Sequence, residues 1–203
     1  MWTSWSRTWA KGYLSAGRTA KAYPCHSSFH AVIEGVQKFR TAHEYKPSDV
    51  HGVRITGGHS MMEARFCNRK PDTILGAQYS LPWATALALT RDVSAPEVWR
   101  TLDFGDVEVG RIASTMELLE DSARFSGPVA EVALTLAGTD YSLLVKDWKG
   151  APTNPYTFDE MADKLNRYAA DSLPLSRTNE LVERVAALEK EPDMGNFAGL
   201  IRG

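Results

Sequence analysis

The stretch KAYPCHSSFH, residues 21–30, holds the densest chemistry of the sequence, with a lysine, a cysteine and two histidines around one proline. His26 and His30 are four residues apart, so a helix would place both on one side beside Cys25, which is a weak zinc spacing. No second cluster at recognisable spacing supplies further ligands. Cys25 could instead be a nucleophile, but it needs a base, and chain neighbours rarely face each other. The pattern alone favours a structural role, with Pro24 and Cys25 packed at a strand-to-helix corner.

Two helices are predicted to hold this corner. Ser27 or Ser28 is a suitable N-cap for a helix over 28–43, in which apolar residues recur at helical spacing. Pro82 stands where a first helical turn tolerates proline, so an apolar helix is expected over 82–91.

A small sheet should pack against these helices. Residues 49–56 alternate loosely and predict a strand, while the alternating runs 129–136 and 141–145 flank AGTD, a hairpin signature. We therefore expect an α+β fold: a small antiparallel sheet with packed helices, followed by a helical tail.

The tail begins after a joint rich in proline and glycine, GAPTNPYT. Thr157 with Glu160 three residues later is a capping box, and an amphipathic helix is expected over 176–191. The predicted parts are therefore three: an amino-terminal segment 1–20, an α/β domain 21–150 and carboxy-terminal helices 151–203.

The amino-terminal segment carries no acidic residue before Glu34. Trp2, Trp5, Trp9 and Tyr13 are spaced by three and four, so a helix would gather them on one face. A basic, serine-rich start can be a transit peptide. The aromatic spacing favours a helix that docks on, or packs against, a partner.

Composition excludes several functional classes. A net charge of −2 over 203 residues, without a long basic run, argues against nucleic acid as the main partner. Two cysteines without CxxC spacing fit a reducing compartment. No apolar run reaches the roughly 18 residues that a membrane span requires. We expect a cytoplasmic protein with no membrane partner.

A cationic stretch follows the first predicted strand. Residues 56–73, TGGHSMMEARFCNRKPDT, contain His59, Arg65, Arg69 and Lys70. These side chains could guide a polyanionic substrate, although a solvated loop is the simpler interpretation.

Four stretches resemble the MmgE/PrpD family in the same order. KAYPCHSSFHAVIEGV resembles its K-x-Y/F-P segment with a later histidine, and AQYSLPWATALAL resembles its A-Q-F-S-x-P-Y segment. Residues 127–165 resemble its strand pair, its joint and the helix after it, and residues 181–201 resemble its terminal helix. The family includes 2-methylcitrate dehydratase, cis-aconitate decarboxylase and iminodisuccinate epimerase.

The resemblance implies a lyase or isomerase that acts on a di- or tricarboxylic acid by proton abstraction, without a metal or organic cofactor. Lys21 matches the family lysine that would hold a carboxylate or stabilise enolate-like charge, and His30 matches a histidine that would act as acid or base. Five further residues would line the substrate pocket: Cys25, His26, Gln78, Ser80 and Trp83. Trp83 replaces the family's usual tyrosine or phenylalanine, so any hydroxyl contributed there is lost.

The resemblance also implies an incomplete enzyme. Family members carry a long helical domain before the lysine segment, whereas only about twenty residues precede Lys21 here. We therefore expect a homo-oligomer or a second chain that supplies a helical domain. The alternative is a non-catalytic remnant or accessory subunit that binds such a partner.

Overall fold

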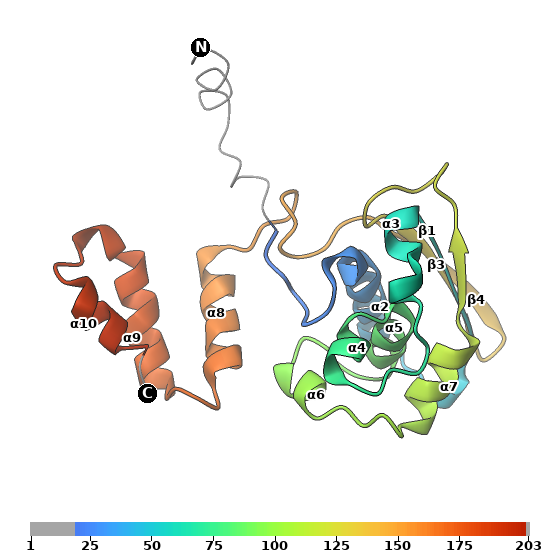
Figure 1. Ribbon diagram of the computed structural model, residues 1–203, viewed down its shortest axis with the longest axis horizontal. Coiled ribbons are helices and arrows are strands. Elements are labelled where there is room, and N and C mark those ends of the chain that lie inside the picture. The colour runs from blue at the N-terminus through green and yellow to red at the C-terminus, as the bar shows by residue number, and fades with distance from the viewer. Residues whose placement is uncertain (1–18, 202–203) are drawn as a thin grey trace, which may run out of the picture. The chain divides into compact units, whose positions relative to one another are not determined.

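The computed structural model describes residues 19–201, so the predicted aromatic face of Trp2, Trp5, Trp9 and Tyr13 lies outside the described residues. The chain divides after Pro155 into an α/β unit and a helical unit, whose elements are labelled in Figure 1. This division falls within the proline- and glycine-rich joint, a few residues beyond the predicted boundary.

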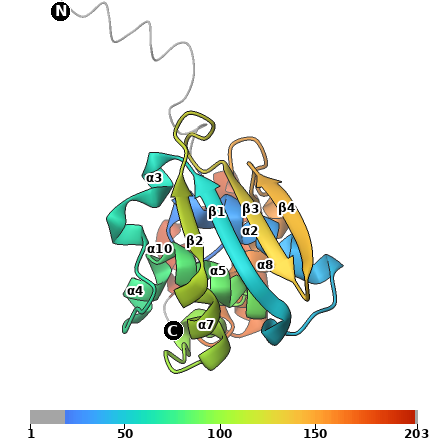
Figure 2. The ribbon, with the colours of Figure 1, turned by 90° about the vertical axis from the view of Figure 1, so that its right-hand side faces the viewer.

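The α/β unit is built on a four-stranded sheet with the order β2-β1-β3-β4. Strands β3 (Ala130–Leu136) and β4 (Thr139–Val145) form the predicted hairpin, and β1 (Val50–Gly57) pairs antiparallel with β3. The edge strand β2 (Glu117–Glu120) lies parallel to β1 (Figure 2). The predicted α+β fold is confirmed, with one parallel strand pair that the sequence pattern did not predict.

The loose alternation of β1 has a structural cause. In β3 every second residue from Ala130 is buried, as the two-residue period of a strand requires. In β1 the pairing register shifts between Val50 and Gly52, which marks a β-bulge. Because of this extra residue, Val50 and Val53 are both buried although an odd number of steps separates them.

The turn between β3 and β4 consists of Ala137 and Gly138, with φ angles of 46° and 87°. Positive φ at both central residues is the geometry of a type I′ hairpin turn, which favours asparagine before glycine. Alanine pays a steric penalty in this region because its Cβ crowds the backbone.

Replacing Ala137 by asparagine is therefore expected to raise the free energy of unfolding by about 0.5–1 kcal/mol. Ala137→Val should lower it, because a β-branched residue tolerates positive φ poorly. Urea unfolding of the chain measures both. Equal stability of the two variants would contradict the turn assignment.

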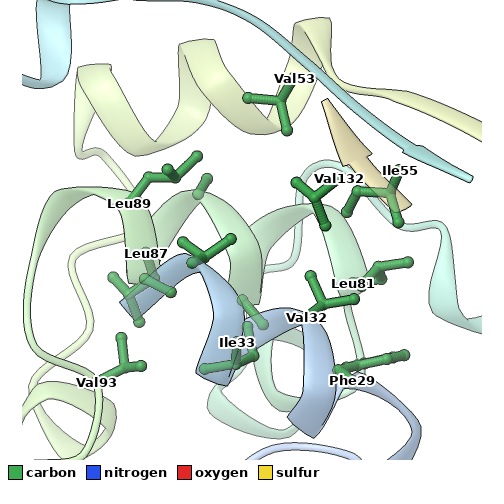
Figure 3. Packing of buried hydrophobic residues seen from close by; sticks show 14 of the residues in the cluster. Phe29, Val32, Ile33, Val53, Ile55, Leu81, Leu87, Leu89, Val93 and Val132 are labelled. Carbon is green, nitrogen blue, oxygen red and sulfur yellow. The ribbon is translucent and has the colours of Figure 1, made fainter. Parts of the chain in front are cut away.

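Three longer helices occupy the buried side of the sheet in Figure 2: α2 (His30–Ala42), α5 (Leu81–Thr90) and α7 (Val107–Thr115). The first two confirm the predicted helices, and α2 is preceded by a 3₁₀ turn over Ser27–Phe29. In Figure 3 the side chains of α2 and α5 meet those of β1 and β3 in one core.

Helix α5 is the centre of this core, because every residue from Leu81 to Leu89 is buried. Its first turn is capped by Ser80, whose hydroxyl accepts the Trp83 backbone N–H at 3.0 Å. At its far end, the Gln37 amide donates to the Arg91 carbonyl at 2.9 Å. These caps give hydrogen-bond partners to backbone groups at the helix ends that would otherwise be buried without one. The shorter helices of the unit are α3 (His59–Met62), α4 (Ile74–Gln78) and α6 (Pro96–Arg100).

The helical unit contains α8 (Phe158–Ala169), α9 (Leu175–Ala186) and α10 (Met194–Gly199). The predicted capping box is confirmed: the Thr157 N–H donates to the Glu160 carboxylate at 2.7 Å, and the Glu160 N–H donates to the Thr157 hydroxyl at 3.2 Å. Among residues 19–201, no helix is both long enough and apolar enough to cross a membrane.

Candidate functional site

The segment that precedes α2 turns sharply at Pro24 and meets the end of α4. The Cys25 N–H donates to the Tyr23 carbonyl at 2.8 Å, which closes the turn. The His26 N–H then donates to the Gln78 carbonyl at 2.9 Å. This bond joins two stretches, 52 positions apart in the sequence, that were predicted to share a site. We call the surface around Lys21, His26 and Gln78 the corner.

Lys21 lies at the exposed rim of the corner. Its ammonium donates to the Cys25 carbonyl at 3.1 Å, so the side chain folds back over the turn. A solvent-accessible ammonium held near an imidazole can bind a carboxylate as a point charge.

His26 is half-buried and lies against aromatic rings. Its ring centroid is 4.4 Å from that of Phe66 and 5.2 Å from that of Tyr79. Its Nδ1 accepts the Ser28 N–H at 3.4 Å, which caps the 3₁₀ turn. A nitrogen that accepts cannot carry the proton, so the neutral ring has its proton on Nε2 and donates from there.

The protonation of His26 is set by its surroundings. Burial lowers the pKa of this imidazole, and the positive charges of Lys21 and Arg65 lower it further, while Glu63 acts in the opposite direction. His26 is therefore predominantly neutral at pH 7. A neutral imidazole that donates through Nε2 can stabilise negative charge developing on a substrate oxygen.

His30 occupies a different environment, with none of its surface exposed. Its ring makes edge contacts with Tyr23 and Trp148, at centroid distances of 5.7 and 6.4 Å. A proton-transfer group must come within hydrogen-bond reach of the substrate. The predicted catalytic role of His30 stays a prediction, and the geometry favours His26 as the imidazole that a substrate reaches.

The α5 end of the predicted pocket is also buried. Ser80 has no exposed surface, and its hydroxyl both caps α5 and donates to the Asn68 carbonyl. Trp83 is 3% exposed and packs against Phe104, with centroids 6.0 Å apart. The first turn of α5 is already capped and lies in the core, so it offers no open amide group to a substrate carboxylate. Gln78 is half-buried at the corner.

Cys25 is 2% exposed, and burial raises the pKa of its thiol to about 12. Lys21 opposes this shift without overcoming it. The protonated thiol is a poor nucleophile and a poor metal ligand. No three metal-ligating side chains of His, Cys, Asp or Glu come together within residues 19–201.

A thiol titration with Ellman's reagent tests this assignment. Cys67 is half-buried, and Cys25 is buried. We expect one slowly reacting thiol per native chain and two after unfolding in guanidinium, because Cys25 is reached only when the core opens. Cys25→Ala should leave the native titre unchanged. Two reactive thiols in the native chain would contradict the burial of Cys25.

The cationic stretch after β1 forms two short helical turns, α3 and Ala64–Phe66, and continues without helix or strand over 67–73. Three of its four cationic side chains, those of His59, Arg65 and Arg69, have partners. The His59 ring lies 3.2 Å from the Glu120 carboxylate, and Arg69 donates to the Ala113 carbonyl at 3.3 Å. Of these cationic side chains, Arg65 lies next to the corner. Its Cζ is 4.5 Å from the centroid of the Phe66 ring, which packs on His26. Arg65 was not predicted at the corner, because only the contact between Phe66 and His26 places it there. Tyr79 lies between Gln78 and Ser80, in the segment that was predicted to line the pocket.

Two open hollows, of about 500 and 570 Å³, lie on the exposed face of the sheet. Their charged side chains pair with one another, as Arg54 does with Glu117 at 2.6 Å and Arg124 with Glu131 at 3.0 Å. None of their lining residues belongs to the corner.

Comparison with known proteins identifies the family of this chain. Residues 23–190 match the model of the MmgE/PrpD C-terminal domain, which leaves Lys21 just before the matched region. A search of curated proteins gave no match. The matched region covers most of the chain, including His26 and Gln78 of the corner, the sheet and the first two helices of the tail. The chain belongs to the family of MmgE/PrpD C-terminal domains.

Proposed function

We propose that this chain supplies the α/β half of an MmgE/PrpD-type lyase or isomerase. The substrate would be a di- or tricarboxylic acid, and the reaction a proton transfer at the carbon next to a carboxylate, without a cofactor. The observation that carries the proposal is the corner, where Lys21 and the half-buried His26 meet at the surface of a domain of this family.

The chemistry of these two side chains suits the proposed reaction. Removal of an α-proton places enolate-like charge on the neighbouring carboxylate. The Lys21 ammonium would offset this charge, and the Nε2–H of His26 would donate to the same oxygen. Because His26 is predominantly neutral at pH 7, the donor would be a neutral imidazole N–H and not an imidazolium.

The base is proposed to come from outside the described part of this chain. Near the corner, the carboxylate that acts on His26 is Glu63, which already accepts hydrogen bonds from Arg65. A base supplied by a second chain, or by another copy, would complete the site. This division of roles supports the expectation of a split or oligomeric enzyme.

The helical unit supports the same expectation. Along α8, Phe158, Met161 and Leu165 recur at helical spacing and are 48%, 42% and 36% exposed. Among the described residues of the unit, only Thr178 and Leu181 are buried. An apolar stripe of this kind marks an interface. We propose that it contacts the chain that carries the helical domain.

The second candidate function is a non-catalytic accessory subunit that binds this partner. The observation that favours it is the burial of His30, Ser80 and Trp83, three of the residues predicted to form the site. An accessory subunit would need the apolar stripe but not the corner.

Turnover by the assembled protein tests the two candidates. The protein would be purified from its source with the chains that accompany it, and incubated in D2O with a panel of di- and tricarboxylic acids. Nuclear magnetic resonance would follow product formation and deuterium uptake next to a carboxylate. We expect a helical chain to co-purify and one acid to be converted. A stable complex that converts none of the acids, and exchanges no α-proton, would favour the accessory subunit.

A further inference from the structure

Arg65 extends the cationic character of the corner beyond Lys21 and His26. It is the middle residue of the 3₁₀ turn Ala64–Phe66, about forty positions away in sequence from both. Its guanidinium is held over the Phe66 ring at 4.5 Å, and the same ring also contacts the imidazole of His26 at 4.4 Å. Cationic groups from two separate segments therefore surround one imidazole.

Glu63 fixes the orientation of this guanidinium. Its two carboxylate oxygens lie 2.9 Å from Nε and 3.1 Å from Nη2 of Arg65, a two-point contact along one side of the planar group. No described residue accepts a hydrogen bond from the remaining Nη1. The Arg65 side chain is 62% exposed, so a ligand can reach that nitrogen.

Tyr79 adds a polar group beside His26 and Phe66. It is 40% exposed, and its ring lies 5.2 Å from the His26 ring and 6.2 Å from Phe66. The accessible donors around His26 thus come from the lysine segment, the Arg65 turn and the end of α4. A ligand that engages all of them must carry more than one acceptor group.

We infer that Arg65 binds a second carboxylate of the substrate while Lys21 holds the first, so that Arg65 selects polycarboxylic over monocarboxylic acids. This inference rests on the proposed function for the identity of the substrate. Arginine suits the task because it presents parallel N–H donors to a carboxylate, whereas lysine acts as a point charge. Arg65 is a specificity-determining residue in this account and takes no part in proton transfer.

Citrate and acetate binding to the full chain tests the inference without requiring turnover. The ring-proton signals of His26 would be followed by nuclear magnetic resonance during titration with each acid. Arg65→Gln is expected to weaken citrate binding about tenfold, because one charge-assisted interaction is lost. Acetate binding should be unchanged, because Lys21 is still present. Arg65→Lys should keep part of the citrate affinity.

Arg54→Gln is the matched control, since Arg54 is also exposed and paired with a glutamate but lines the hollows on the sheet. It should leave citrate binding unchanged. Three outcomes would overturn the inference: no citrate binding, equal binding by wild type and Arg65→Gln, or a loss only in Arg54→Gln. Citrate binding that depends on Arg65, without turnover by the complex, would uphold the inference and refute the proposed function. Turnover by the complex, together with citrate binding that does not depend on Arg65, would uphold the proposed function and refute the inference.

Discussion

Replacing Gly35 by alanine is expected to lower the free energy of unfolding of the α/β unit by about 2–3 kcal/mol. Gly35 lies within α2, where its missing side chain lets the helix approach the end of β4. A Cβ atom there would clash with Cγ1 of Val145, which is buried and β-branched and therefore has few alternative rotamers. Urea unfolding monitored by circular dichroism measures the change.

Gly110 provides the matched control. It also lies within a helix, α7, but an added Cβ would meet nothing within 4 Å. Gly110→Ala is expected to raise the free energy of unfolding by up to about 1 kcal/mol, through helix propensity alone. Combining Gly35→Ala with Val145→Ala should cost less than the sum of the two single changes, because the space vacated at Val145 admits the new methyl group. Strictly additive losses would show that the two residues do not compete for space.

Replacing His26 by glutamine is expected to reduce turnover of the assembled enzyme by about 10²–10⁴-fold. Glutamine can imitate the hydrogen bond that caps the 3₁₀ turn, so the fold should survive. A glutamine whose carbonyl oxygen makes this cap holds no N–H donor at the position of the imidazole Nε2, so the hydrogen bond to the substrate oxygen is lost. Steady-state kinetics with the acid identified from the panel would give kcat and kcat/KM for both proteins.

His51→Gln is the control for a histidine lost elsewhere, because His51 is exposed on the open face of the sheet. It should leave turnover unchanged. His30→Gln distinguishes the two candidate histidines. If His30→Gln lost turnover at unchanged stability while His26→Gln kept full activity, the catalytic role would belong to His30.

The parts of the fold that follow local rules were predictable. The hairpin around Ala137 and the capping box at Thr157 depend on residues a few positions apart, and both were found where expected. Strand β2 was missed because its four residues, Glu117–Glu120, include no buried position and show no alternation of buried and exposed side chains. Its existence depends on parallel pairing with β1, which lies about sixty positions earlier in the sequence.

The candidate site also has parts that were predictable from the sequence and parts that were not. The family resemblance implied that the Lys21 segment and Gln78 share a pocket, and a hydrogen bond between His26 and Gln78 connects the two segments. Burial was not predictable, because a histidine at the start of a helix can face either the core or the solvent. His30 faces the core, where it contacts Tyr23 and Trp148. Arg65 was named among the four cations of its stretch, but only the packing of Phe66 on His26 distinguishes it from the other three.

The most direct test of the account is the turnover of the assembled enzyme after replacement of Lys21 by methionine. The account predicts a loss of about 10²-fold or more, because the ammonium that offsets charge on the substrate carboxylate disappears while the length of the side chain is kept. Lys38→Met removes another exposed lysine, which pairs with Glu34 on α2, and should leave turnover unchanged. Full activity of Lys21→Met, or equal losses in both variants, would contradict the claim that the corner is half of an active site.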